Sequence, residues 1–241
     1  MTFEIEWHSQ QGTRTANNRD HAGIGVRGDK LLAIVLDGST RGPTSGQFAE
    51  KIARQMVNWF VASVDETTAE TMAEQLRVAH AALAKDFQSV SASYALLYSE
   101  ATRPVVVLHA GDCLVGRADN GQTTWLLQPH TLANALASVP IDILAREPSR
   151  HVLTRSFRSK HFMAPDLSFI ELDDRPLLVA TDGFWADIDA DGQTAFVNGD
   201  RLPDGDEQDD RSVLSISRIK SDGGITVAGD QAAPNLYVRI A

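Results

Sequence analysis

Two apolar segments of strand length, each ending in Asp-Gly, constrain this chain most strongly. Residues 31–38 are Leu-Leu-Ala-Ile-Val-Leu-Asp-Gly, and residues 177–183 are Leu-Leu-Val-Ala-Thr-Asp-Gly. A continuous apolar run that stops at a turn signal is typical of a strand buried on both faces. Asp37 and Asp182 would then stand at the rim of a sheet, where two carboxylates can share a cation. Asp-Gly is also common in ordinary turns, so the pattern alone leaves that alternative open.

Periodicity predicts two long helices in the first half of the chain. Apolar residues recur at three- and four-residue spacing over residues 46–64 and again over residues 67–87. This pattern favours two amphipathic helices that pack against a sheet. A short helix is expected near residues 132–136, and the acidic, glycine-containing stretch 187–210 is predicted to be a loop.

Short alternating or apolar runs predict many strands. They lie at residues 3–7, 22–26, 31–36, 93–98, 105–110, 114–117, 123–127, 169–172, 176–181, 212–216 and 236–240. Turn signals at residues 27–29, 119–121 and 222–224 predict hairpins, and Asp173-Asp174 predicts a turn between two of the strands. No repeat or linker divides the chain, so we expect a single domain over residues 1–241, an α+β sandwich of mostly antiparallel strands with helices outside.

Composition excludes several classes of function. The 241 residues carry a net charge of −10, which argues against nucleic acid or an anionic membrane as the main partner. Cys113 is the single cysteine, so neither an internal disulfide nor a thiolate metal cluster can form. The first residues have neither the basic nor the apolar region of a signal peptide, and no run approaches the ~18 apolar residues of a membrane span. We therefore expect a cytoplasmic protein.

Four aspartates stand at predicted strand boundaries and indicate a metal site. They are Asp20, Asp37, Asp182 and Asp209. Hard oxygen ligands at scattered loop ends suit Mg²⁺ or Mn²⁺ better than zinc. Two such ions sharing a carboxylate activate water for phosphoester hydrolysis, and Arg14 is placed to clamp a phosphate. On spacing alone this hypothesis is one of several.

Seven short motifs then occur in order. They are Arg14…Asn18-Arg19-Asp20, Val35-Leu36-Asp37-Gly38, Ala110-Gly111-Asp112-Cys113, Leu127-Gln128-Pro129-His130-Thr131, Val152-Leu153-Thr154-Arg155, Ala180-Thr181-Asp182-Gly183-Phe184-Trp185 and Asp209-Asp210-Arg211-Ser212-Val213. Their order over residues 14–213 resembles the metal-dependent serine/threonine protein phosphatases of type 2C in their compact bacterial form. Each motif is weak by itself, and the ordered set carries the resemblance.

The resemblance implies a four-layer αββα sandwich, in which two central, mostly antiparallel sheets flanked by helices hold two Mn²⁺ or Mg²⁺ ions. Carried over by position, Asp37 would bridge both ions. Asp182 and Asp209 would hold the first ion, and Asp20 with the Gly38 carbonyl the second.

The resemblance also implies substrate and partners. Arg14 would bind the phosphate of a phosphoserine or phosphothreonine in a protein, which a water activated by the two metal ions would attack. Asp112 corresponds to a position that in some bacterial members helps to bind a third, weaker ion. A serine/threonine kinase would oppose the activity, and the chain would act as a monomer or in a regulatory complex.

Several departures from the family pattern motivate a second hypothesis. Arg19 replaces the usual Glu or Gln before Asp20, and Arg14 lies one residue further from Asp20 than in the family. A bulky turn at residues 39–43 provides no obvious general acid, although Arg41 could assist electrostatically. The alternative is therefore a catalytically weak or inactive phosphatase-like binding module.

Two assignments stay open at this level. Ala186 occupies the place of the family's second Asp in the Asp182 motif, which argues against a third ion. Asp209 and Asp210 are adjacent, and either could be the ligand. His130 is interpreted as a structural histidine that caps a turn.

Overall fold

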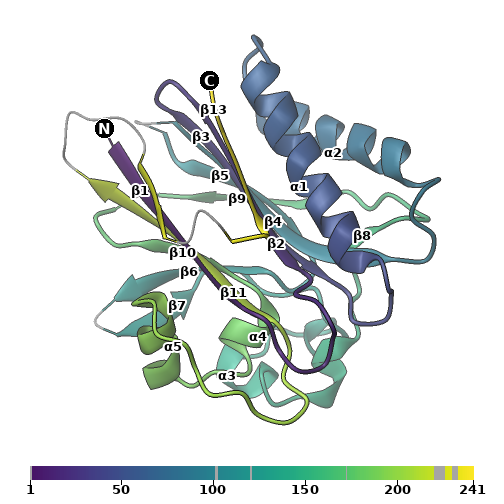
Figure 1. The fold of residues 1–241 in the computed structure, drawn as a ribbon, viewed down its shortest axis with the longest axis vertical. Helices are drawn as coiled ribbons and strands as arrows, with labels where there is room; N and C mark the ends of the chain where they lie inside the picture. Colours follow the sequence, from purple (N-terminus) through teal and green to yellow (C-terminus); the bar gives the residue numbers. More distant parts are fainter. Residues whose placement is uncertain (1, 101–102, 120, 172, 220–225, 230–232) are drawn as a thin grey trace.

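The computed structural model describes the chain except residues 1, 101–102, 120, 172, 220–225 and 230–232. Two sheets pack face to face (Figure 1). In the first sheet the strands are, in spatial order, β12 (Thr226–Gly229), β1 (Thr2–Gln10), β11 (Arg211–Ile219), β10 (Leu177–Ala180), β6 (Leu114–Asp119) and β7 (Gln122–Trp125). In the second they are β13 (Leu236–Ile240), β2 (Asp20–Arg27), β3 (Lys30–Gly38), β4 (Ser91–Glu100), β5 (Val105–Ala110) and β9 (Asp166–Ile170), with β8 (Phe157–Arg158) paired to β4.

The core between the sheets follows from the alternation along their strands. In β1, Phe3, Ile5 and Trp7 are at most 1% exposed, while the residues between them are partly exposed. β3 is buried on both faces, because residues 31, 33 and 35 enter the core between the sheets whereas residues 32, 34 and 36 enter the core under the helices. The strand predicted from the first Asp-Gly segment is thus confirmed.

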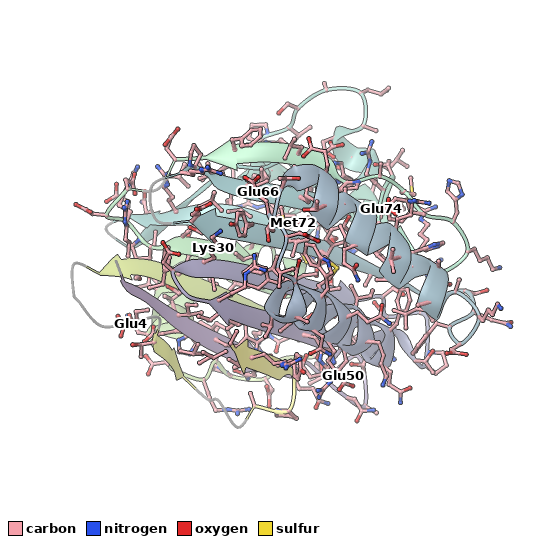
Figure 2. All side chains as sticks on the ribbon, turned by 90° about the horizontal axis from the view of Figure 1, so that it is seen from above. Glu4, Lys30, Glu50, Glu66, Met72 and Glu74 are labelled. Carbon is pink, nitrogen blue, oxygen red and sulfur yellow. The ribbon has the colours of Figure 1, made fainter. Side chains whose placement is uncertain are left out.

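Two long helices cover the outer face of the second sheet. They are α1 (Ser45–Ala62) and α2 (Ala69–Leu83). Seen from above, the two helices lie side by side across the strands (Figure 2). The buried residues of each helix lie on one face, as the spacing predicted: Phe48, Ala49, Ile52, Ala53, Met56, Val57, Phe60, Met72, Leu76, Ala79 and Leu83. α2 starts with a capping box, in which Thr68 and Thr71 each accept a backbone N–H of the other.

Short helices form the layer on the outer face of the first sheet. They are α3 (Ile141–Leu144), α4 (Asp182–Trp185) and α5 (Ala190–Val197), at the lower end of Figure 1. Phe184 and Phe196 anchor this layer, with ring centroids 5.8 Å apart. The predicted αββα order is confirmed, although this layer has no long helix among the described residues.

The loop predicted over residues 187–210 was wrong in its first half, which forms α5. The helix begins because the Asp189 side chain accepts the backbone N–H of Gly192 at 2.8 Å. Two single 3₁₀ turns, η1 (Leu132–Asn134) and η2 (Pro148–His151), lie in the irregular region between β7 and β8. η1 falls where a short helix was expected.

The last strands pair with the first ones. β12 runs parallel to β1 and β13 runs parallel to β2, which the sequence did not predict. Asn235, directly before β13, donates to the Asp20 carbonyl oxygen at 2.9 Å and to Ser9 Oγ at 2.7 Å. The hairpin predicted at residues 222–224 lies outside the described residues, and the one at 119–121 includes residue 120, which is also outside them. In the described part of the chain, no helix is both long and apolar enough to cross a membrane.

Candidate functional site

The β2–β3 hairpin brings the first two aspartates together. Asp20 is the first residue of β2 and lies opposite Asp37 near the end of β3. Because alternate residues of a strand share a face, both side chains point into the space between the sheets, as Ala22 and Val35 do. Ser93 of β4 lies opposite Asp37 on its other side.

The second Asp-Gly segment supplies Asp182 from the opposite sheet. β10 ends at Ala180, and Asp182 begins the short helix α4. A Cβ atom on Gly183 would lie 2.0 Å from the carbonyl oxygen of Asp210, so only glycine permits this close packing of backbone on backbone. The glycine thereby brings Asp182 beside the segment that leads into β11.

These strand ends border a cleft of about 660 Å³. The predicted residues on its wall are Arg14, Asp37, Asp112, Asp182 and Asp209. The two sheets thus bring five of the predicted side chains, from residue 14 to residue 209, to one opening. A cleft of this kind, with converging charged groups, is typical of a binding site.

Asp20 and Gly38 lie outside the wall of this cleft. Gly38 is buried as the last residue of β3, directly after Asp37. Asp20 is 1% exposed, and its Oδ2 accepts a hydrogen bond from Thr181 Oγ1 at 2.9 Å. Its Oδ1 is buried and has no hydrogen-bond partner among the described residues. An unpartnered buried carboxylate oxygen is costly and marks a place for a cation or a proton.

The adjacent Asp209 and Asp210 have different surroundings. Asp210 is buried, and its two oxygens accept the backbone N–H groups of Gly12 at 2.8 Å and Arg19 at 2.7 Å. Asp209 lines the cleft, and its Oδ2 accepts Arg14 Nη1 at 2.8 Å. Asp210 therefore holds the backbone that leads to Asp20, whereas Asp209 is the aspartate of this pair that faces the cleft.

Asp20, Asp37, Asp112, Asp182 and Asp209 form a carboxylate cluster, in which burial and neighbouring charges raise the pKa of several members. Burial, and then the charges of Asp20 and Asp182, raise the pKa of Asp37 well above its usual range. Burial and the charge of Asp182 raise the pKa of Asp112 to about 7, and the same two causes raise that of Asp209. The cluster therefore has more negative charge than its protein surroundings neutralise.

This donor set fits divalent cations of the Mg²⁺ or Mn²⁺ type. The cleft presents the carboxylates of Asp37, Asp112, Asp182 and Asp209, and Asp20, whose Oδ1 has no partner among the described residues, lies opposite Asp37 in the neighbouring strand. Small hard cations favour such oxygens. The residues present thus match the ligands that the sequence predicted, and their part in binding stays a proposal.

Arginines surround the cluster. Arg14 pairs with Asp209, whereas Arg19 donates from Nη1 to the Ser39 carbonyl oxygen at 2.8 Å and to Ser45 Oγ at 3.2 Å. The guanidinium of Arg19 is thus tied to the turn after Gly38. These hydrogen bonds explain how a positively charged side chain is accommodated at the position directly before Asp20.

Three site residues were missed from the sequence. Arg150 in η2 is 5% exposed and donates to Asp182 Oδ2 at 2.8 Å. Ser93 donates to Asp112 Oδ1 at 2.5 Å, and Thr181 donates to Asp20 as described above. Arg150 belongs to no motif, and only the folded chain places it near Asp182. Thr181, in contrast, stood within the Asp182 motif.

A second group of possible metal ligands lies near the edge strand β9. His109, His130 and Asp166 have ligand atoms within 4.8 Å of one another. His130 Nδ1, however, accepts the backbone N–H of Gly111 at 3.1 Å, so the proton of the neutral ring sits on Nε2, 3.0 Å from Asp166 Oδ2. A metal ion on Nε2 would break this arrangement. The contact agrees with the structural role expected for His130.

Comparisons with known proteins identify the fold. Models of protein families give no match, and curated proteins give no match either. Among solved structures, serine/threonine phosphatase Stp1 from Staphylococcus aureus aligns with a TM-score of 0.74 at 14% identity, over 89% of this chain and 94% of that chain. This is the fold of bacterial serine/threonine phosphatases.

Two further structures with this fold align over similar lengths. The S. agalactiae serine/threonine phosphatase has a TM-score of 0.73 at 17% identity, over 90% of this chain and 100% of that chain. The catalytic domain of serine/threonine protein phosphatase PstP, solved in complex with two manganese ions, has a TM-score of 0.64 at 15% identity, over 89% and 97% of the chains. The architecture expected from the ordered motifs is therefore confirmed.

Proposed function

We propose that this chain is a Mn²⁺- or Mg²⁺-dependent phosphatase that hydrolyses phosphoserine and phosphothreonine in proteins. The observation that carries the proposal is the cleft in which Asp37 and Asp112 meet Asp182, Asp209 and Arg14. The aspartates come from both sheets of a fold whose solved representatives include serine/threonine phosphatases. Five charged groups of this kind are unlike the lining of an apolar ligand pocket.

In the proposed enzyme the aspartates bind two ions. Asp37 would be a ligand of both ions, Asp182 and Asp209 would hold the first, and Asp20 with the Gly38 carbonyl would hold the second. The contact of Asp20 with Thr181, directly before Asp182, supports a compact arrangement of these ligands. When bound, the ions supply the positive charge that lets water act as a nucleophile near neutral pH and that offsets the charge of the phosphate.

The chain's own residues would position the substrate. Arg14 offers the remaining N–H groups of its guanidinium to the phosphate, since one N–H already bonds to Asp209. Arg41 and Arg158 also line the cleft, and they favour a substrate with further negative charge near the phosphate. Asp112, 5% exposed and bonded to Ser93, keeps the floor of the cleft polar.

The proposal extends to partners and setting. A phosphoprotein substrate implies a serine/threonine kinase whose product it is. The net charge of −10 disfavours nucleic acid and anionic membranes as partners. We infer that the protein acts in the cytoplasm as one domain, as a monomer or in a regulatory complex.

A phosphatase-like binding module is the second candidate. It is favoured by one observation: the guanidinium groups of Arg14 and Arg150 already engage Asp209 and Asp182. A module of this kind would keep the fold and recognise a phosphorylated partner without hydrolysing it.

Hydrolysis of a phosphothreonine peptide distinguishes these candidates. It is measured with Mn²⁺ and with a chelator, for the wild type, Asp37→Asn and Asp182→Asn. An enzyme shows turnover that requires metal and is lost in both variants. No turnover, with Mn²⁺ still raising the melting temperature, would reject the enzyme in favour of the binding module. If Mn²⁺ neither binds nor supports turnover, the metal site itself is wrong.

A further inference from the structure

A buried guanidinium lies inside the carboxylate cluster. Arg150 is 5% exposed; its Nη1 donates to Asp182 Oδ2 at 2.8 Å and its Nη2 to Asp187 Oδ1 at 2.7 Å. Its guanidinium carbon lies 5.9 Å from the centroid of the Trp185 ring. The two nitrogen atoms of one planar group thus join both ends of α4, because Asp182 begins this helix and Asp187 follows it.

This contact differs from the other ion pairs around the site. In the Arg14–Asp209 pair the side chains are 32% and 18% exposed, so water screens it. The side chains of Arg150 and Asp182 are 6% and 8% exposed. A buried charge is tolerated only when it is paired and hydrogen-bonded, so Arg150 and Asp182 depend on one another.

The same carboxylate is one that we propose to bind a divalent ion. A guanidinium on Oδ2 of Asp182 removes that oxygen from metal binding and repels a cation that approaches from its side. The same guanidinium bonds to Asp187 Oδ1, so this oxygen is also unavailable to a metal ion. The Trp185 side chain links this corner to the rest of the site, since its Nε1 donates to the Asp112 carbonyl oxygen at 2.8 Å.

We propose that Arg150 acts as an internal counterion on the Asp182–Asp187 side of the carboxylate cluster. As a result, the wild-type site binds one divalent ion fewer than it would bind without this arginine. The inference rests on the proposed function, because it takes Asp182 as a metal ligand. It assigns to the arginine a role in determining metal stoichiometry. A merely structural role, in which Arg150 orients Asp182 for metal, has the opposite consequence, since loss of the arginine would then weaken metal binding.

Mn²⁺ titration of metal-free protein by calorimetry separates the two roles. For Arg150→Gln we expect one additional Mn²⁺ per chain, or binding at least about tenfold tighter than in the wild type. Arg150→Lys keeps the charge and should stay close to the wild type. Arg117→Gln is the matched control, because it removes an ion pair of similar length, 2.7 Å to Asp173, away from the cluster.

A second variant protects the test against loss of the fold. Arg150→Gln leaves Asp182 and Asp187 without their arginine partner. We therefore combine it with Asp187→Asn, so that the double variant loses one positive and one negative charge. The double variant should still bind Mn²⁺ more tightly at Asp182 than the wild type. The rise in melting temperature on adding Mn²⁺ should also be larger than in the wild type for both variants, which is a readout independent of activity.

The outcomes distinguish this inference from the proposed function. If the wild type binds Mn²⁺ and hydrolyses the peptide but both Arg150 variants bind Mn²⁺ more weakly or equally, the counterion inference is wrong and the proposed function stands. If neither the wild type nor the variants bind Mn²⁺, both are wrong. Tighter binding in both variants, without turnover in the wild type, supports the counterion and rejects the enzyme.

Discussion

Asp20 lies directly opposite Asp37 in the antiparallel pair of β2 and β3, and burial raises the pKa of both carboxyl groups well above their usual range. Neighbouring acids in a sheet repel each other when both are ionised. Here the repulsion is not offset by a hydrogen bond to Asp20 Oδ1 among the described residues. The pair therefore opposes folding of the metal-free chain at neutral pH, and this has measurable consequences.

Asp37→Asn removes one of these charges with little change of shape. We expect the metal-free variant to unfold at a higher temperature than the wild type, with a gain of about 1–3 kcal/mol in the free energy of unfolding. The rise in melting temperature with Mn²⁺, and peptide hydrolysis, should both be lost. Asp29→Asn, in the exposed turn between β2 and β3, is the control that should change neither. An unchanged response of Asp37→Asn to Mn²⁺ would contradict the assigned ligand.

The pH dependence of stability should differ with and without metal. The pKa of Asp112 is raised to about 7, so the fold binds more protons than the unfolded chain between this value and the ordinary value of about 3.9. The contribution of Asp112 to the stability of the metal-free protein should therefore rise as pH falls from about 8 to about 6, whereas His21 and His109, whose pKa values burial lowers to about 4, contribute in the opposite direction. With Mn²⁺ the trend should reverse, because protons compete for the ligands. Melting curves of the wild type and Asp112→Asn in chelator, and of the wild type in Mn²⁺, test this. In chelator the wild type should be less stable than Asp112→Asn at pH 8, and a difference that does not narrow by pH 6 would refute the prediction.

Arg14→Ala tests the phosphate contact. If the guanidinium binds the phosphate, kcat/KM for the peptide should fall about tenfold to hundredfold, mainly through KM, and Arg14→Lys should restore part of it. Arg77→Ala removes an arginine from the exposed face of α2, where it pairs with Glu74, and should leave the kinetics unchanged. Equal KM values in the wild type and Arg14→Ala would assign the substrate phosphate to another residue.

Gly183→Ala tests the close packing of the backbone at Gly183 against the backbone of Asp210. The new Cβ would meet the Asp210 carbonyl oxygen, which as backbone cannot move aside, so we expect a loss of about 1–3 kcal/mol in the free energy of unfolding. Gly205→Ala is a milder comparison, because its Cβ would meet the end of the flexible Gln208 side chain at 2.9 Å. Urea denaturation measures both. Equal midpoints for the two variants would show that the chain relaxes at Gly183 without cost.

The spacing of apolar residues correctly predicted those strands and helices in which buried residues recur at regular intervals. The strand before Asp37 and the helices α1 and α2 were found because their apolar spacing reports the face that is buried. Asp37 and Asp182 were singled out because two apolar runs both end in Asp-Gly, and the ordered motifs then favoured a site over two ordinary turns. The order of the motifs added the sandwich, which the solved phosphatase structures confirm.

Contacts between distant segments could not be read from pattern. Arg150 lies 32 residues from Asp182, so neither position indicates the other in the sequence. The parallel pairing of β13 with β2 joins residues more than two hundred positions apart, and no hairpin signal marks it. α5 was missed because its acidic composition is typical of a loop, whereas Asp189 is a helix cap and Phe196 an anchor in the core.

Asn235 has a further consequence for how the molecule is made. Its bond to the Asp20 carbonyl oxygen spans 215 residues, and β1 and one edge of β2 pair with strands that are synthesised much later, β11 and β13. At about 5–20 residues per second, a ribosome needs about 10–40 s to cover that span. During this time β2, β3 and β4 can pair with one another, but β1 lacks both of its partners, β11 and β12. We therefore expect the carboxylate cluster to assemble only after β11 and Asn235 have left the ribosome.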